Sequence, residues 1–104
     1  NNNKYVIMNT DYKIIKIGAK RCPPCVRFDM ALSNIKSMCN YEIVVYDHDK
    51  DDIPKEYLRY VLALPTFLIY KEDGFVDKFV GYANDVQFIN KVNAIVDTHT
   101  KLTK

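Results

Sequence analysis

The chain contains 104 residues, of which 48% are hydrophobic and 27% charged, and its 15 basic and 13 acidic side chains give a formal net charge of +2 at pH 7. This length and apolar content predict a single domain over residues 1–104 and argue against disorder. No cluster of Lys and Arg forms a nucleic-acid track, and no apolar run approaches the roughly 20 residues of a membrane span. We expect a soluble monomer that binds neither nucleic acid nor membrane.

The number of cysteines indicates in which cellular compartment the protein is found. An odd number in so short a chain argues against a disulfide-stapled secreted domain, which would need a larger, even set. The first residues, Asn1-Asn2-Asn3-Lys4, are unlike a secretory signal. We therefore expect one working pair of cysteines, one spare cysteine and a cytoplasmic location.

Strand and helix patterns alternate along the chain. Strand-like runs rich in β-branched and aromatic residues cover residues 5–8, 12–18, 41–46, 66–70 and 75–80. Helical patterns cover residues 25–39, 51–61 and a final segment that Asn84 or Asp85 can cap. Asp73-Gly74 predicts a tight turn, so the last two strands should form an antiparallel hairpin. The order predicts an α/β fold in which helices cover a central mixed sheet.

Each long helix should bury one apolar face, and the short one should begin near a proline. The first helix has its apolar side chains at Val26, Phe28, Met30, Ala31, Leu32, Ile35 and Met38. The last helix has them at Val86, Ile89, Val92, Ile95 and Val96. In the segment 51–61, Pro54 suits the first helical turn.

The motif Cys22-Pro23-Pro24-Cys25 stands at the start of the first helix. If Cys22 is the N-cap, the two prolines occupy the first two helical positions, where a missing N–H group costs no intrahelical hydrogen bond. The two cysteines then lie on the same side of the turn, and Cα separations of roughly 4.4 to 6.8 Å permit a disulfide. The spacing therefore predicts a disulfide that closes and opens reversibly.

The charges around this turn favour a reactive Cys22. A thiolate at a helix N-terminus is stabilised by the helix dipole, and Lys20, Arg21 and Arg27 add positive charge. We expect the Cys22 thiol to ionise below the free-thiol pKa of about 8.5. Since the second helical residue is a proline, the N–H group of Cys25 is the expected donor to the Cys22 sulfur.

Two other interpretations of the cysteine pair remain open. Together with Cys39 and His48, the pair could supply three thiolates and one imidazole to a zinc ion. Against this, Cys39 falls at the far end of the helix, roughly 20 Å away at about 1.5 Å per residue; it suits a core position at the helix end. The third interpretation, two inert buried cysteines, conflicts with the basic setting of the turn.

The sequence resembles the thioredoxin family over nearly the whole chain after residue 11. The resemblance rests on the strand before the cysteine motif and on features listed in chain order: Cys22-Pro23-Pro24-Cys25, a strand ending near Asp47 to Asp49, Leu64-Pro65-Thr66 before a strand, Gly74, Gly81 and a terminal helix. It implies a thioredoxin-like fold and a protein dithiol-disulfide oxidoreductase. In that enzyme Cys22 attacks substrate disulfides and Cys25 resolves the mixed disulfide.

The resemblance also implies a substrate groove and partners. It implies a cis peptide bond before Pro65, and a groove for an extended substrate segment along Leu64 and residues 80–82. The expected substrate-binding residues are Arg21, Pro23, Pro24, Leu64, Pro65, Gly81 and Tyr82. No bound cofactor or metal is implied. The partners are protein disulfide substrates and a flavin-dependent reductase or other thiol donor.

Several positions depart from the family pattern. Arg21 stands where Trp is usual, Pro23 where Gly is usual, and Lys16 where an acidic residue usually assists the buried sulfur. We hypothesise that Lys16 approaches Asp47 or Asp49 and tunes Cys25; the alternative is a lysine that extends to solvent. These departures keep open a second function, a redox-modified protein-binding module with little catalytic activity.

The family's first helix should be reduced or absent. Too few residues separate Met8 from Tyr12 for a helical crossover, which needs about a dozen residues. The N-terminal strand at residues 5–8 is therefore expected to pair differently from the family pattern, or to be reduced.

Overall fold

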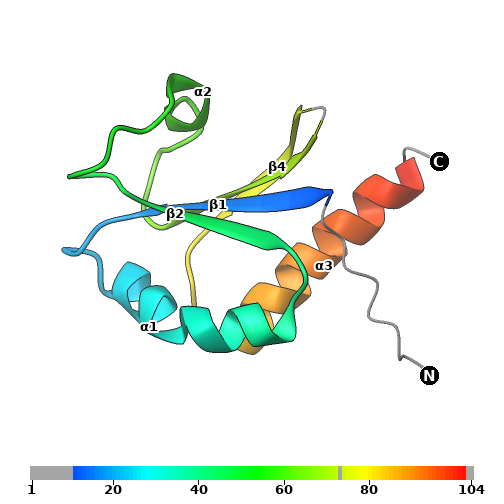
Figure 1. Cartoon of the computed structure of the whole chain (residues 1–104), viewed down its shortest axis with the longest axis horizontal. Coiled ribbons are helices and arrows are strands. Elements are labelled where there is room, and N and C mark those ends of the chain that lie inside the picture. Colours follow the sequence, from blue (N-terminus) through cyan, green and yellow to red (C-terminus); the bar gives the residue numbers. More distant parts are fainter. Residues whose placement is uncertain (1–10, 73, 103–104) are drawn as a thin grey trace.

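The computed structural model describes residues 11–72 and 74–102, which form a four-stranded mixed sheet and three helices (Figure 1). The elements in chain order are β1 (Tyr12–Gly18), α1 (Pro23–Met38), β2 (Glu42–Asp47), α2 (Lys55–Leu58), β3 (Thr66–Lys71), β4 (Gly74–Val80) and α3 (Asp85–Leu102). The sheet order is β2-β1-β3-β4; β1 is parallel to β2 and antiparallel to β3, and β3 and β4 form the expected hairpin. The predicted strand at residues 5–8 lies outside the described residues.

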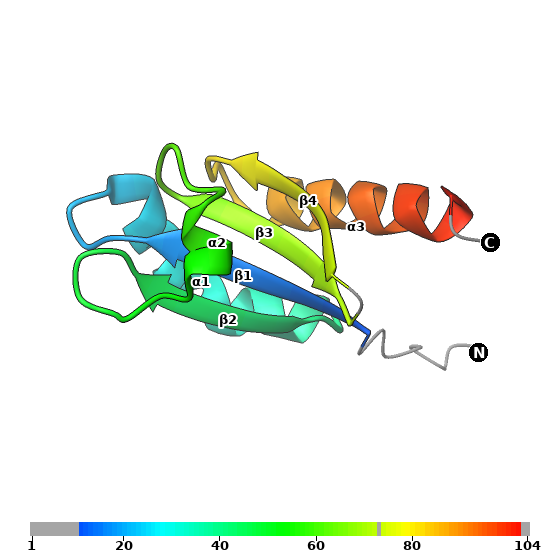
Figure 2. The same ribbon diagram turned by 90° about the horizontal axis from the view of Figure 1, so that it is seen from above.

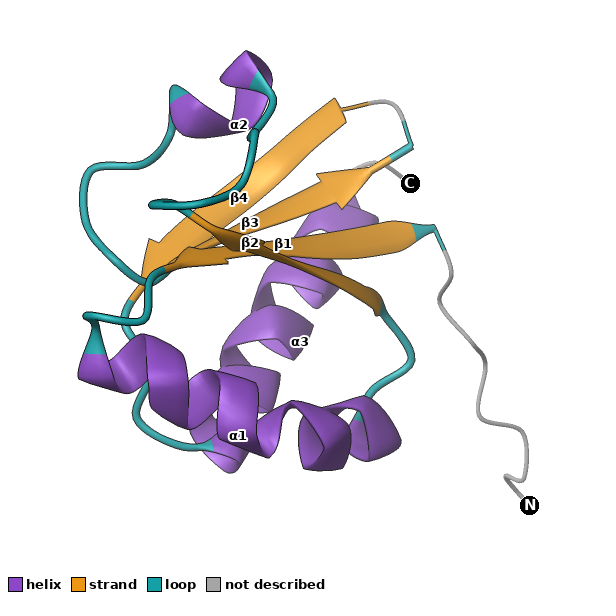
Figure 3. Ribbon diagram, turned by 60° about the vertical axis from the view of Figure 1, so that its left-hand side comes forward, coloured by secondary structure: helices purple, strands orange, loops and turns teal. Residues whose placement is uncertain are grey.

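The helices cover the two faces of the sheet unequally. Helices α1 and α3 lie on one face and the short α2 on the other (Figures 1 and 3), and the view from above shows α2 over the strands (Figure 2). In the part of the chain that the structure describes, no helix precedes β1, in agreement with the expectation of a reduced or absent first helix. None of the described helices is long and apolar enough to cross a lipid bilayer.

Strand β1 is an inner strand of the sheet, and it is buried on both faces because helices cover the sheet on either side. Alternate side chains of a strand point to opposite faces, so Tyr12 and Ile14 enter the core under α1 and α3, while Ile15 and Ile17 enter the core under α2. Residue 16 has the same parity as Tyr12 and Ile14, which directs its side chain toward α1. The central strand thus brings one lysine into an otherwise apolar layer.

Helix α1 buries a narrower face than the sequence pattern predicts. Its buried residues are Cys25, Phe28 and Ile35, with Ala31 and Leu32 partly buried beside them. The predictions for Val26, Met30 and Met38 are wrong, because these side chains are 37%, 81% and 46% exposed. The burial of Cys25 in the first turn sets the rotation of the helix, and the turns that follow at 3.6 residues each keep Phe28 and Ile35 on the same side.

Helix α3 is capped as expected but buries a different set of residues. The side chain of Asn84 accepts a hydrogen bond from the backbone N–H of Gln87 at 2.9 Å, which identifies Asn84 as the cap. The buried residues are Phe88, Ile89, Val92 and Val96. Of the predicted face, Val86 is exposed and Ile95 only partly buried, whereas Phe88 was not predicted.

The segment predicted as a helix over residues 51–61 is helical only at Lys55–Leu58. Pro54 is the N-cap and has an extended ψ of 138°, so the prediction of Pro54 in the first helical turn is wrong. The residue before it, Ile53, is buried against β1 and β3, which holds the preceding chain in an extended path. Tertiary burial therefore shortens this helix.

Phe28 joins α1 to the sheet and to α3. Its ring centroid lies 5.0 Å from that of Phe67 on β3 and 5.1 Å from that of Phe88 on α3. We expect Phe28→Ala to lower the free energy of unfolding by about 3 to 5 kcal/mol, since it removes a fully buried ring. Met30→Ala, on the exposed side of the same helix, should change it by no more than about 0.5 kcal/mol. Urea denaturation of the oxidised proteins measures both; equal losses would show that the assigned face of α1 is wrong.

Candidate active site

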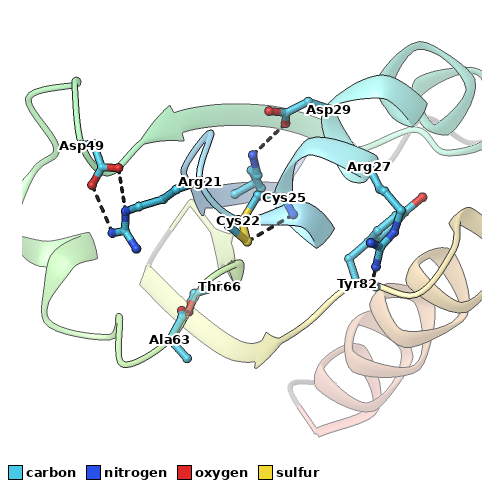
Figure 4. Close-up of a disulfide and its surroundings, with 10 residues drawn as sticks. Arg21, Cys22, Cys25, Arg27, Asp29, Asp49, Ala63, Thr66 and Tyr82 are labelled. Carbon is cyan, nitrogen blue, oxygen red and sulfur yellow. Dashed lines mark hydrogen bonds and ion pairs between the residues drawn. A yellow bond between two sulfur atoms is a disulfide. The ribbon is translucent and has the colours of Figure 1, made fainter.

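The two cysteines of the motif form a disulfide at the first turn of α1 (Figure 4). Cys22 is the N-cap with extended φ and ψ of −108° and 106°, and Pro23 and Pro24 occupy the first two helical positions, as predicted. The backbone N–H of Cys25 donates to Sγ of Cys22 at 3.3 Å, and the two Cα atoms are 5.2 Å apart. The geometry predicted for a reversible disulfide is therefore present.

The two sulfur-bearing residues differ in their access to solvent. Cys25 is fully buried, whereas Cys22 and Pro24 are partly exposed and Pro23 is exposed. Because a reaction partner can reach only the exposed sulfur, Cys22 is the residue that can attack or be attacked from outside. Cys25 can react only with a sulfur that Cys22 presents to it.

Gly18, at the end of β1, allows α1 to approach the sheet closely. A Cβ atom at this position would lie 2.7 Å from Cε and 2.7 Å from Nζ of Lys16, and 2.9 Å from Cβ of Cys25. Any larger residue at position 18 would therefore displace the side chains of Lys16 and Cys25. The glycine requirement comes from this close approach rather than from backbone conformation.

Beside Cys22 the chain forms an open groove of about 430 Å³. Its lining residues are Arg21, Cys22, His48, Val61, Leu62, Ala63 and Leu64. Leu62 is 87% exposed and presents an apolar side chain at the edge of this groove. Of the expected substrate-binding residues, the groove thus brings together Arg21 and Leu64 beside the reactive sulfur.

The loop that forms one wall of the groove is held by the chain around Pro65. The Leu64–Pro65 peptide bond is cis, as the family resemblance implied. The hydroxyl of Thr66 donates to the carbonyl of Ala63 at 2.6 Å, and the N–H of Gly81 donates to the carbonyl of Pro65 at 2.9 Å. Gly81 has a φ of +96°, a conformation that favours glycine. Pro65 itself is buried and contributes by shaping the loop.

Gly81 and Tyr82, expected as substrate-binding residues, are partly exposed but do not line this groove. The carbonyl of Tyr82 accepts a hydrogen bond from Nη2 of Arg27 at 3.4 Å. Figure 4 shows this contact on the opposite side of the disulfide from Arg21. Any contribution of Gly81 and Tyr82 to binding would therefore extend the surface past Cys22.

Sequence reasoning missed four lining residues, namely His48, Val61, Leu62 and Ala63. One signal for three of them was available, because Val61-Leu62-Ala63-Leu64 is an apolar run directly before Pro65 and outside any strand pattern. His48 gave no such signal, since its place beside the groove depends on how the loop after β2 folds back.

Arg21 does not point its charge at the disulfide. Its Nε donates to Oδ2 of Asp49 at 2.8 Å and its Nη2 to Oδ1 at 3.1 Å, so the guanidinium binds the carboxylate through two hydrogen bonds. Figure 4 shows the side chain extending from the turn toward Asp49. These hydrogen bonds raise the pKa of Arg21 and lower the pKa of Asp49. The positive potential that the sequence predicted at Cys22 is reduced by this pairing.

The prediction that Lys16 pairs with Asp47 or Asp49 is wrong. Nζ of Lys16 donates to Oδ1 of Asp29 on α1 at 2.7 Å. Asp49 is engaged by an arginine, and the carboxylate of Asp47 accepts the backbone N–H of Asp49 at 2.9 Å, which holds the loop after β2. Because α1 packs directly over β1, it brings an acidic residue to the lysine that sequence spacing could not identify. The alternative of a solvent-exposed lysine is also wrong, since Lys16 is only 1% exposed.

Cys39 is the C-cap of α1 and is partly buried against the main core, as expected for a helix-end core residue. Its N–H donates to the carbonyl of Ile35 at 3.1 Å. Within the described ranges, no three His, Cys, Asp or Glu side chains gather closely enough to hold a metal ion. The zinc interpretation of the cysteine pair therefore lacks its set of ligands there.

Comparison with known proteins places these features in context. The family model described as Thioredoxin matches residues 1–94. Oxidised mitochondrial thioredoxin 3 from Saccharomyces cerevisiae is similar, with 28% identity, coverage of 84% of this chain and 81% of the yeast chain, and a TM-score of 0.63. A yeast chain from a structure on thiol resolution in mitochondrial 1-Cys peroxiredoxin via glutathione/thioredoxin systems shares 27% identity over 84% of this chain and 81% of that one, with a TM-score of 0.64.

A more distant solved structure supports the fold alone. Thioredoxin from Fasciola hepatica shares 24% identity over 83% of each chain, with a TM-score of 0.65. No curated protein sequence matches this chain significantly. The family assignment therefore depends on the family model, which matches residues 1–94.

The pairing of Arg21 with Asp49 predicts a measurable change in titration. Because the arginine lowers the pKa of Asp49, the pair stabilises the folded chain above the ordinary pKa of a carboxyl group, and this contribution is lost as the pH falls through the lowered value. In Arg21→Ala we expect the pKa of Asp49 to rise toward its ordinary range. Carboxyl ¹³C NMR titration measures the midpoint, with Lys20→Ala as the control that removes a neighbouring charge but keeps the pair. An unchanged midpoint in Arg21→Ala would contradict this assignment.

Proposed function

The chain belongs to the thioredoxin family, and from this premise we propose that it is a protein dithiol-disulfide oxidoreductase. In the proposed reaction Cys22 attacks substrate disulfides and Cys25 resolves the mixed disulfide that results. The single observation that carries the proposal is the asymmetry of the disulfide, in which one cysteine is partly exposed beside a groove and the other is fully buried behind it.

The reaction proceeds in two exchanges. The thiolate of Cys22 attacks one sulfur of the substrate disulfide; a mixed disulfide forms, and the other substrate sulfur leaves as a thiolate that takes a proton from water. The thiolate of Cys25 then attacks Sγ of Cys22, the bond to the substrate breaks, and the second substrate sulfur leaves. Two electrons pass from the two cysteines to the substrate, which is released as a dithiol.

The N-terminus of α1 supports the role of Cys22 as the attacking group. The N–H of Cys25 donates to its sulfur at 3.3 Å, and the positive end of the helix dipole favours the thiolate. Pro23 and Pro24 carry no N–H groups, so they limit this stabilisation to one backbone donor while they keep the turn rigid. The backbone hydrogen bond and the helix dipole therefore stabilise the proposed Cys22 thiolate more than the charge of Arg21 does.

A substrate would bind as an extended segment along the groove. The apolar side chains of Leu62 and Leu64 offer shallow hydrophobic contact, and Arg21 lines the groove beside Cys22. We propose that Arg21, Pro23, Pro24, Leu64, Gly81 and Tyr82 contact the substrate, and that the buried Pro65 contributes by shaping the loop that carries Leu64. A surface that relies on backbone and shallow apolar contacts accepts many sequences, so the proposed substrates are protein disulfides of varied sequence.

The proposed cycle uses no bound cofactor. Electrons that leave through Cys22 must be restored by a partner, for which we propose a flavin-dependent reductase or another thiol donor. We further propose that the chain acts as a cytoplasmic monomer.

The departures at Arg21 and Lys16 also fit a second function, a protein-binding module with little exchange activity. Reduction of insulin disulfides by the protein with dithiothreitol as electron donor separates the two. We expect catalysed reduction that falls to the uncatalysed rate in Cys22→Ser, because this variant has no attacking sulfur. In Cys25→Ser, mass spectrometry should detect a trapped mixed disulfide between Cys22 and the substrate.

The matched control is Cys39→Ser, which should retain the activity because this thiol lies at the other end of α1. Absence of catalysis by the unmodified protein would favour the binding module, and catalysis that survives Cys22→Ser would contradict the proposed nucleophile.

A further inference from the structure

Lys16 is the only charged side chain that is buried among residues 11–72 and 74–102. It lies in the middle of β1, and its neighbours across the sheet are Val45 on β2 and Phe67 on β3. Neither of these side chains can neutralise the charge of the lysine or accept a hydrogen bond from it. An ammonium group removed from water is costly unless it is paired. The position of this lysine therefore calls for an electrostatic explanation.

The ammonium group lies beside the buried cysteine of the disulfide. A Cβ atom at Gly18 would lie 2.7 Å from Nζ of Lys16 and 2.9 Å from Cβ of Cys25, so both atoms border the same point. No side chain occupies that point, since the residue there is glycine. The positive charge therefore faces Cys25 at close range.

The known partner of Lys16 neutralises its charge only in part. Asp29 accepts one hydrogen bond from Nζ, and its carboxylate is 49% exposed, so water weakens its field. An ammonium group has three N–H donors. Within the described part of the chain, Asp29 is the one hydrogen-bond acceptor of this group; the ring of Phe28 lies 5.8 Å from Nζ. The site can thus accommodate a second anionic partner.

Reduction of the disulfide supplies such a partner. We propose that Lys16 stabilises the thiolate form of Cys25, the form that attacks the mixed disulfide; this inference rests on the function proposed above. The thiol proton of Cys25 leaves to water, the thiolate lies opposite the ammonium group, and its electron pair then forms the bond to Sγ of Cys22 as the bond to the substrate sulfur breaks. Lys16 acts through Cys25 and has no contact with the substrate.

The charges around Cys25 oppose one another in a way that can be tested. Lys16 from β1 favours the thiolate, whereas Asp29, one turn along α1, disfavours it. Cys22 is the other ionisable group of this turn, and Arg27 is exposed and donates to a backbone carbonyl. Removal of the lysine and removal of the aspartate should therefore move the ionisation of Cys25 in opposite directions, which no loss of packing would do.

The test uses the full chain with Cys22→Ser and Cys39→Ser, so that Cys25 is the only thiol. The pH dependence of its ¹³Cβ NMR shift reports the pKa directly and needs no substrate. We expect Lys16→Met to raise this pKa by about one unit or more, a tenfold decrease in thiolate at a given pH below the pKa. Asp29→Asn, which retains the ammonium group, should lower it. Far-UV circular dichroism checks that each variant is folded.

A second readout uses the chain with both active cysteines. Cys22 is joined to 2-nitro-5-thiobenzoate, and the release of the coloured thiolate reports the attack by Cys25. We expect Lys16→Met to shift the pH profile of release to higher pH and to slow release about tenfold near pH 7. Asp29→Asn should shift the profile to lower pH.

An unchanged pKa of Cys25 in Lys16→Met, or a rise in Asp29→Asn, would overturn the inference. If Lys16→Met does not fold, Lys16→Gln replaces it: a raised pKa of Cys25 supports the inference and an unchanged or lower one overturns it. The pKa measurement is independent of insulin reduction, so loss of the proposed function and loss of this inference can be distinguished.

Discussion

The burial of Cys25 against β1 is the constraint on which the rest of the site depends. Because this cysteine enters the core in the first turn of α1, it sets which face of the helix packs on the sheet and leaves Cys22 at the N-cap, partly exposed. The same contact requires Gly18 at the end of β1 and places the ammonium group of Lys16 beside the buried sulfur. This one packing contact thus produces an accessible sulfur at Cys22, a buried sulfur at Cys25 and a positive charge next to the buried sulfur.

Features controlled by nearby residues could be predicted from the sequence. The N-cap role of Cys22 follows from two prolines that can start a helix but not continue one, and the β3–β4 hairpin follows from the Asp73-Gly74 turn signal. The run of β-branched residues at 12–18 identifies a strand, and the structure shows that this strand is buried on both faces. The cis bond before Pro65 was available only from the family resemblance, because local sequence does not distinguish the two isomers.

Features controlled by contacts between distant segments could not be predicted in this way. Apolar side chains at Val26 and Met30 are compatible with a buried face, and only the packing of Cys25 shows that they point to solvent. The partner of Lys16 is chosen by the position of α1 over β1, and the charge of Arg21 is drawn to Asp49 by the fold of a loop 28 residues away. The charges that surround the two sulfur atoms could therefore be identified only from the structure.

The proposed function requires that Cys22 and Cys25 pass reversibly between a dithiol and a disulfide. Equilibration of the protein with glutathione buffers of graded ratio, followed by acid quenching, alkylation and mass spectrometry, measures this directly. We expect one two-electron transition in which both thiols of the pair become protected from alkylation together. The transition should be reversible from either direction and absent in Cys22→Ser. A pair that stays alkylated at every glutathione ratio, or a transition that persists without Cys22, would contradict it.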